Sequence, residues 1–150
     1  MVMKDVPAHE LSRDHIKLCD FGLCVISSCA QDPVVSQVTL KGTPGFFAPE
    51  MVEGTFDAKP ADMWSVGCTL MELSEGFMEG WFESYTMYRK DTANFHQGIR
   101  NCLTMVQDRD YFADVHVFEL VRDLLRMEPE HRLTASQVLE HDWFLNDGSQ

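Results

Sequence analysis

An apolar stretch at residues 61–73 lies near the middle of the chain. Its residues would be apolar on nearly every face of a helix, which is typical of a helix that is buried all round. Pro60 directly precedes the stretch and suits the first turn of such a helix. Gly67 inside it costs roughly 0.8–1 kcal/mol relative to alanine, which indicates close packing against the backbone there. The pattern therefore predicts a buried central helix.

Two later stretches, at residues 95–106 and 117–125, repeat apolar residues at the spacing of one helix face. This periodicity predicts two amphipathic helices. Pro129 disfavours a helical backbone, so the second helix is expected to end before it. Thr134 with Gln137 matches a capping box, which predicts that another helix begins there.

The N-terminal part of the chain has a period of two instead. Residues His15–Cys19 alternate polar and apolar side chains, as a half-buried strand does. Met1–Met3 resembles the remnant of a second short strand, and a polar connection containing Pro7 separates the two. We therefore predict a mainly α fold with a short N-terminal β-hairpin that ends at Asp20.

Composition narrows the possible functions. The chain has 150 residues, 45% of them hydrophobic and 24% charged, which suits one globular domain rather than a disordered tail. Its net charge of −12 argues against nucleic acid or an anionic membrane as a partner. No apolar run reaches the roughly 18 residues that a membrane span needs. The negative charge suits basic peptide substrates, but a solubilising surface explains it equally well.

The five cysteines are an odd number without close C-x-x-C pairing. This favours reduced thiols and a cytoplasmic or nuclear location. The even spacing of Cys19, Cys24 and Cys29 could suggest a zinc site. Structural zinc ligands usually come in tighter pairs, so ordinary free cysteines are the better interpretation.

Two short motifs frame the segment between residues 20 and 50. Asp20-Phe21-Gly22 opens it, and Ala48-Pro49-Glu50 closes it after a Gly-Thr-Pro sequence at residues 42–44. Either tripeptide alone is a weak signal, but in this order and spacing they are a strong one. Together they resemble the two ends of the activation segment of a serine/threonine protein kinase, in the C-terminal lobe of that fold.

The resemblance continues to the C-terminal part of the chain and covers about Ile16 to Phe144. Residues 128–135 resemble the family pattern D-P-x-x-R-x-T/S-A, with Glu128 in place of aspartate. Residues 141–144 resemble H-P-W-F, with Asp142 in place of proline, and the apolar stretch at 61–73 resembles the central helix F of kinases. The match is weak between residues 76 and 114. The sequence around Gly42 leans towards the calmodulin-dependent group.

The resemblance implies a cofactor site at the first motif. Asp20 would bind a Mg²⁺ ion that bridges the phosphates of ATP. Phe21 would pack as a hydrophobic peg, and Gly22 would adopt backbone angles denied to other residues. Thr43 would contact the catalytic aspartate beside the acceptor hydroxyl. A lone aspartate at a strand end more often has a turn or capping role, and only the residues that follow Asp20 favour the metal.

The resemblance also implies three structural or regulatory residues. Glu50 would pair with a buried Arg132, since a planar guanidinium against a carboxylate suits burial. Asp62 would accept backbone N–H groups near the start of the buried helix and would support the catalytic loop in a kinase. Thr39 is a candidate site for phosphorylation by an upstream activating kinase, the alternative being an unmodified threonine.

Other parts of the kinase machinery have no match in these residues. The sequence contains no H-R-D-x-x-x-x-N catalytic loop, because Ser12 stands where histidine should be and the asparagine position falls on Cys19. The glycine-rich loop and the V-A-I-K-type lysine have no match either. We therefore expect residues 1–150 to be a partial kinase domain that is inactive alone. Its parent function would be phosphoryl transfer from Mg-ATP to serine or threonine hydroxyls of protein or peptide substrates. The alternative is a kinase-like scaffold that binds proteins through the activation loop or the aromatic residues near Trp81.

Overall fold

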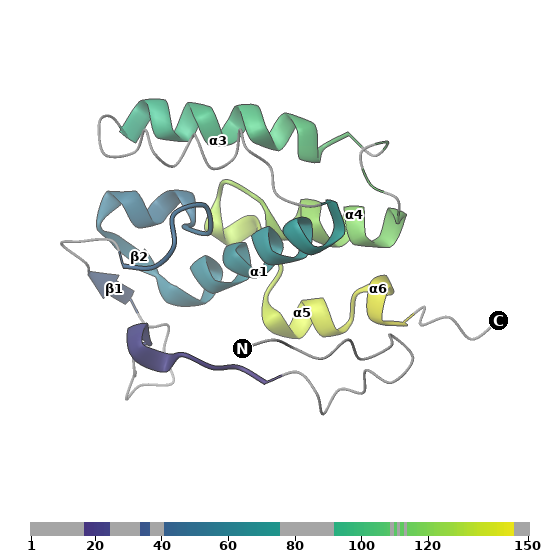
Figure 1. Cartoon of the computed structure of the whole chain (residues 1–150), viewed down its shortest axis with the longest axis horizontal. Coiled ribbons are helices and arrows are strands. Elements are labelled where there is room, and N and C mark those ends of the chain that lie inside the picture. The colour runs from purple at the N-terminus through teal and green to yellow at the C-terminus, as the bar shows by residue number, and fades with distance from the viewer. Residues whose placement is uncertain are drawn as a thin grey trace, which may run out of the picture.

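Helices make up most of the computed structural model, which describes residues 17–24, 34–36, 41–75, 92–108, 110, 112 and 114–145 (Figure 1). The longest of the described helices is α1 (Ala58–Glu75), which runs through the middle of the molecule. In Figure 1, α3 (Thr92–Val106) lies on one side of α1, and the short helices α5 (Ala135–Leu139) and α6 (Asp142–Leu145) lie on the other. Helix α4 (Val115–Leu124) packs against α1, α3 and α6. The mainly helical fold predicted from the sequence is confirmed.

The core forms around α1, as its apolar sequence predicts. Ala61, Trp64, Cys68 and Met71 recur every three or four residues along α1, and all four are buried. Phe95 and Ile99 of α3 reach the same core, and neither is exposed at all. Burial of this set is the main source of stability for the fold.

Gly67 explains how closely α4 approaches α1. A methyl group at this position would lie 2.8 Å from Leu125 Cδ2 and 2.9 Å from Leu124 Cβ. A real Cβ atom essentially never makes contacts of this length. The close packing that the sequence predicted at Gly67 is therefore present.

Capping side chains set the starts of two other helices. Asp114 Oδ1 accepts hydrogen bonds from the N–H groups of His116 at 2.8 Å and Val117 at 3.4 Å, where α4 begins. The predicted capping box is present at α5: Thr134 Oγ1 accepts from Gln137 N at 3.3 Å, and Gln137 Oε1 accepts from Thr134 N at 2.8 Å.

The two-stranded sheet lies at a different place from the predicted hairpin. Strand β1 (Val34–Ser36) pairs antiparallel with β2 (Thr55–Asp57), so that Val35 lies opposite Phe56. Of the predicted hairpin, residues 17–19 do not form a strand, and the remaining positions lie outside the described residues. Leu18 shows why the prediction was wrong here, because its side chain is 87% exposed and has no core to alternate against.

Within the described ranges, no helix is both long enough and apolar enough to cross a membrane. Of the cysteines that the structure describes, Cys19 and Cys24 are exposed, and Cys68 and Cys102 are buried. Burial raises the pKa of the Cys68 thiol far above its usual range, so this thiol is chemically inert at neutral pH. Cys29 lies outside the described residues.

Candidate functional site

A pocket of about 400 Å³ lies where the D-F-G turn meets the start of α1. It brings together three residues that are distant in the sequence, Asp20, Thr43 and Asp62. Its remaining walls are mostly apolar and come from both strands, the loop at 41–51 and α1. The other lining residues are Leu23, Cys24, Val35, Lys41, Gly42, Phe46, Phe47, Met51, Phe56, Ala58, Ala61 and Ser65.

Asp20 stands at the edge of this pocket in an unusual backbone conformation. Its φ of 62° and ψ of 65° place it in the left-handed region, which few residues other than glycine adopt. A short 3₁₀ helix follows at Phe21–Leu23, and Cys24 N donates to Phe21 O at 3.2 Å. The Asp20 side chain is exposed, and no described residue donates a hydrogen bond to its carboxylate. Within the described part of the chain, the turn therefore presents a carboxylate without a donor.

Two details of the D-F-G turn differ from the sequence prediction. Gly22 does not have a positive φ, and Asp20 is the residue that adopts the left-handed conformation. Phe21 is 65% exposed, so it does not act as a packed hydrophobic peg within this chain.

Thr43 reaches the pocket from a loop shaped by two glycines. Gly42 has φ 125° and Gly45 has φ 100°, so both need the conformational freedom that only glycine has. Phe46 N donates to Thr43 O at 3.3 Å and closes a turn between them. The Thr43 side chain is exposed and faces the same pocket as Asp20.

Asp62 does not cap α1, contrary to the prediction. The capping hydrogen bond is instead accepted by Asp57 Oδ1 from Lys59 N at 3.0 Å, because α1 begins at Ala58 and Asp62 already lies in its second turn. Among the described residues, none donates a hydrogen bond to the Asp62 carboxylate. Partial burial raises the pKa of Asp62 above its ordinary value of 3.8. Asp62 is thus a carboxylate on the exposed side of α1 that has no hydrogen-bond donor among the described residues.

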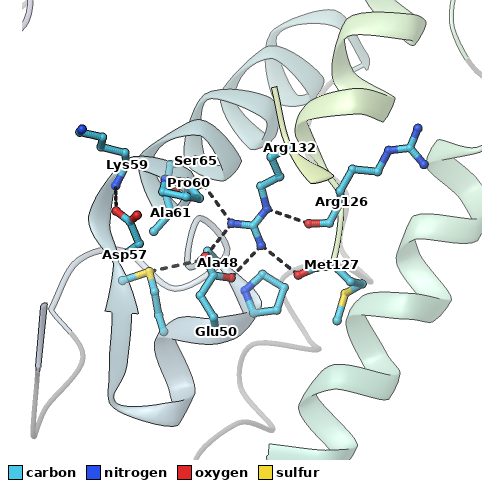
Figure 2. Close-up of polar contacts among 12 residues, drawn as sticks. Ala48, Glu50, Asp57, Lys59, Pro60, Ala61, Ser65, Arg126, Met127 and Arg132 are labelled. Atoms are coloured by element: carbon cyan, nitrogen blue, oxygen red, sulfur yellow. Dashed lines mark hydrogen bonds and ion pairs between the residues drawn. The ribbon is translucent and has the colours of Figure 1, made fainter. Parts of the chain in front are cut away.

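A buried ion pair joins Glu50 to Arg132, as the sequence predicted (Figure 2). Arg132 Nη1 donates to Glu50 Oε1 at 2.6 Å, and Nη2 donates to Oε2 at 2.7 Å. The Arg132 side chain is 1% exposed, and that of Glu50 is 13% exposed. This two-pronged contact ties the end of the activation segment to the loop before α5, 82 residues along the chain.

The remaining Arg132 donors are also used. Nε donates to Arg126 O at 2.7 Å, Nη1 to Pro60 O at 3.0 Å and Nη2 to Met127 O at 3.0 Å. A guanidinium group has five N–H donors, so these bonds and the two to Glu50 satisfy all of them. The guanidinium carbon also lies 5.0 Å from the centre of the Trp64 ring. Arg132 is therefore saturated and has a structural role.

A second pocket, of about 650 Å³, lies on the other side of Asp62, between the start of α1 and residues 129–136. Arg132 lines it without a free donor, as shown above. Asp62 is the only residue that lines both pockets described here. It therefore stands at the boundary between them.

Sequence reasoning missed two side chains that hold the backbone near the pocket. Ser65 Oγ donates to Phe46 O at 2.8 Å, and the His96 ring nitrogen Nε2 lies 3.0 Å from Pro49 O. Neither residue belongs to a recognisable motif. Ser65 is one of several polar residues in α1, so its sequence position gives no signal that sets it apart.

The candidate phosphorylation site Thr39 lies outside the described residues, as does the aromatic group near Trp81. Both remain predictions from the sequence.

Comparison with known proteins agrees with the geometry. Residues 9–144 match the protein kinase domain. The serine/threonine-protein kinase PLK4 of Drosophila grimshawi is 32% identical over 143 residues, which are 92% of this chain and 16% of the relative. PLK4 of Drosophila melanogaster is 32% identical over 140 residues, which are 90% of this chain and 16% of the relative. The probable serine/threonine-protein kinase fhkB of Dictyostelium discoideum is 34% identical over 137 residues, which are 88% of this chain and 11% of the relative.

This chain thus spans about one sixth or less of the length of these relatives. Its match nevertheless runs from before the D-F-G turn to Phe144 in α6, and it includes both ends of the activation segment. The chain therefore belongs to the protein kinase family, and its relatives there are serine/threonine kinases.

Proposed function

We propose that this chain forms the C-terminal part of a catalytic domain that transfers the γ-phosphoryl group of ATP to serine or threonine hydroxyls of proteins. The observation that supports this function is the pocket of about 400 Å³ that collects Asp20, Thr43 and Asp62. A fold that needed these residues only for stability would use their side chains in hydrogen bonds or ion pairs. Asp20 and Asp62 instead keep carboxylates to which no described residue donates.

ATP and Mg²⁺ are used by the protein kinase family in general, and the pocket fits part of such a site. Asp20 would supply one carboxylate ligand, which suits Mg²⁺ because this ion prefers oxygen and keeps several of its waters. Among the described residues, no group of three or more histidine, cysteine or acidic side chains could hold a metal by itself. When bound, the ion would neutralise charge on the phosphates. This chain thus contributes one ligand and one wall to the site.

Thr43 would orient the acceptor side of the same pocket. It sits between two glycines with positive φ, in a turn closed by the bond from Phe46 N to Thr43 O, and it is exposed. Asp62 would accept hydrogen bonds from the catalytic loop of a complete kinase, and its lack of a partner in the described residues is consistent with that role. A missing catalytic base alone is worth roughly 10²–10⁴-fold in rate. We therefore propose that the 150-residue chain alone is inactive.

The substrate class that fits best is a protein or peptide with basic character, because the chain carries a net charge of −12. Phosphorylation of Thr39 by an upstream kinase would add about −1.5 to −2 charges to the activation segment. Both statements, and a cytoplasmic or nuclear location, remain predictions.

A chimera provides the test. This chain would be joined to the part of the Drosophila melanogaster PLK4 sequence that precedes their region of similarity, and phosphate incorporation into a mixed serine/threonine peptide library would be measured. We expect activity from the chimera and none from the chain alone. Asp20→Asn should reduce the activity by on the order of 10²-fold, the usual effect of losing one electrostatic group. Asp110→Asn, at another exposed aspartate, is the matched control.

A folded chimera whose activity is unchanged by Asp20→Asn would contradict the proposal. A folded but inactive chimera would favour the alternative, a kinase-like scaffold that binds proteins. The exposed side chains of Phe21 (65%), Leu23 (59%) and Leu73 (78%) would suit such a binding role.

A further inference from the structure

Residues 46–50, here called the closing segment, are held from three different directions. Ser65 on α1 contacts the carbonyl of Phe46, and His96 on α3 contacts the carbonyl of Pro49. The third contact is the ion pair between Glu50 and Arg132. The three contacts come from elements that are far apart in the sequence, so they fix the segment relative to the whole fold.

The ion pair alone does not fix the backbone of this segment. It holds the end of a flexible glutamate side chain, and that side chain could keep its contact while the preceding residues shift. The bonds from Ser65 and His96 end on main-chain carbonyls instead. The carbonyls of Phe46 and Pro49 therefore have their positions set directly by α1 and α3.

The hydroxyl of Ser65 has one proton and two acceptors within reach. Phe46 O lies at 2.8 Å and Ala61 O at 3.2 Å. Ala61 O is one turn earlier in α1, where the helix itself supplies an N–H donor from Ser65. Phe46 O is therefore the favoured acceptor, because it lies closer to the Ser65 hydroxyl and because Ala61 O already receives the helical N–H. The Ser65 hydroxyl thus donates to the closing segment rather than to its own helix.

His96 has an equally defined role. A carbonyl only accepts hydrogen bonds, so Nε2 must carry the proton that is donated to Pro49 O at 3.0 Å. The ring lies half-buried beside Phe95, with ring centres 5.7 Å apart, and Phe95 is completely buried. Packing therefore holds the imidazole in the orientation that the bond requires. This contact links α3 to the 3₁₀ helix at Pro49–Glu53.

We infer that Ser65 and His96 are positioning residues that hold the closing segment, and through the turn from Phe46 N to Thr43 O they also place Thr43 at the pocket. The statement that Thr43 faces an acceptor hydroxyl rests on the proposed function. The positioning itself does not, because it concerns only the hydrogen bonds of the folded chain.

Hydrogen–deuterium exchange of the full 150-residue chain, read by mass spectrometry, tests this inference. We expect Ser65→Ala and His96→Leu each to speed exchange of peptides covering residues 43–51 by about threefold to tenfold, the factor equivalent to losing one hydrogen bond. Exchange in α4 should stay unchanged. His96→Gln should restore much of the protection, because its amide can donate to the same carbonyl.

Two matched controls separate this role from general helix effects. Thr69→Ala removes a hydroxyl that donates to Ser65 O at 2.9 Å within α1, and Gln97→Leu removes an amide that donates to Asn101 at 2.9 Å within α3. Neither control should alter exchange at residues 43–51.

A nitrogen-15 spectrum of the histidine rings adds a direct signature, since the His96 Nε2–H tautomer should be present in the wild-type chain. Unchanged exchange at residues 43–51 in both test variants would overturn the inference. Equal acceleration throughout the molecule would also overturn it, because that result would mean a global loss of stability. Failure of the kinase chimera would leave these results untouched, so the two proposals can fail separately.

Discussion

The two ends of the activation segment differ in how completely this chain satisfies their polar groups. At Glu50, a carboxylate and a guanidinium are buried together, and all five N–H donors of Arg132 have acceptors. At Asp20, a carboxylate is exposed beside a pocket, in a strained backbone conformation and without a donor among the described residues. The polar groups of the first end are satisfied within the described residues, whereas the second end keeps a carboxylate to which none of them donates.

This difference separates structural chemistry from binding chemistry. Burying an ion pair is costly unless every remaining donor is also satisfied, so the Glu50–Arg132 centre must be complete for the fold to be stable. A binding site must keep polar groups available, and it places them where water can satisfy them before a ligand does. Backbone strain at such positions is maintained by the surrounding fold. The predictions below test whether the two ends behave in these two ways.

The largest expected effect belongs to Arg132. Arg132→Met would leave the Glu50 carboxylate and three carbonyl groups without their donor, and loss of one partner of a buried pair typically costs about 3–5 kcal/mol. We expect the free energy of unfolding, measured by urea denaturation and circular dichroism, to fall by about this amount. For a small domain this is a large share of the total stability.

Arg126→Met is the matched control for that experiment. Arg126 lies close by in the sequence and pairs with Asp123 at 2.6 Å, but its side chain is 44% exposed. An exposed pair of this kind contributes about 1 kcal/mol or less. If Arg132→Met cost no more than Arg126→Met, the view of the Glu50 end as the structural end would be wrong.

The second-largest expected effect on stability is at Gly67, which is closely packed, and it is compared with Gly22 in the open D-F-G turn. Gly67→Ala would place a methyl group 2.8–2.9 Å from the side chains of Leu124 and Leu125, and such overpacking typically costs about 1–3 kcal/mol. Alanine recovers up to about 1 kcal/mol through its better helix propensity. We expect a net loss of about 1–2 kcal/mol in the same urea experiment, because one of the contacting atoms is a Cβ that cannot move aside.

Gly22→Ala in the D-F-G turn is the corresponding change at the open end. Its added methyl group would lie 3.5 Å from Asp20 Oδ1, an ordinary contact, and Gly22 does not need a positive φ. We expect this variant to unfold within about 0.5 kcal/mol of the wild-type chain. A stabilised Gly67→Ala protein would show that α4 can retreat from α1, and the close packing would then not be a fixed feature.

The two ends of the activation segment also differ in how far the sequence could predict them. The helices followed from hydrophobic periodicity, because burial of one face leaves a regular pattern over many residues. The Glu50–Arg132 pair was predictable only through the resemblance to kinases, since no local pattern connects residues that lie 82 positions apart. The prediction of a strand before Asp20 was wrong for residues 17–19. An alternation over five residues does not show whether a core lies beneath it.

The hydrogen bonds of Ser65 and His96 were not predictable, because each depends on a carbonyl whose position is set by the tertiary fold. The same limit applies to the backbone of the D-F-G turn. The sequence suggested that Gly22 would supply the unusual conformation, but Asp20 supplies it, with φ 62°. Aspartate tolerates the left-handed region better than most residues, so composition alone could not distinguish the two.

The smallest expected effect is at Asp62, where the substitution should raise stability rather than lower it. Burial raises its pKa, so the folded chain binds a proton at Asp62 more readily than the unfolded chain does. As the pH rises above the ordinary value of 3.8 and through the raised pKa, the folded state is therefore increasingly disfavoured relative to the unfolded state. Asp62→Asn removes this charge. We expect the variant to melt at a higher temperature than the wild-type chain at pH 7 and to lose that advantage as the pH falls towards 4.

Asp110→Asn is the control, because it removes the same charge at an exposed position that lines neither pocket, and it should leave the melting temperature unaltered at both pH values. A lower melting temperature for Asp62→Asn at pH 7 would mean that the carboxylate stabilises this chain through its own contacts. Asp62 would then have a structural role, as Glu50 does. A higher one would mean that the fold retains a carboxylate at the pocket boundary against its own stability. Such a residue makes sense where a binding partner, rather than folding, requires the charge.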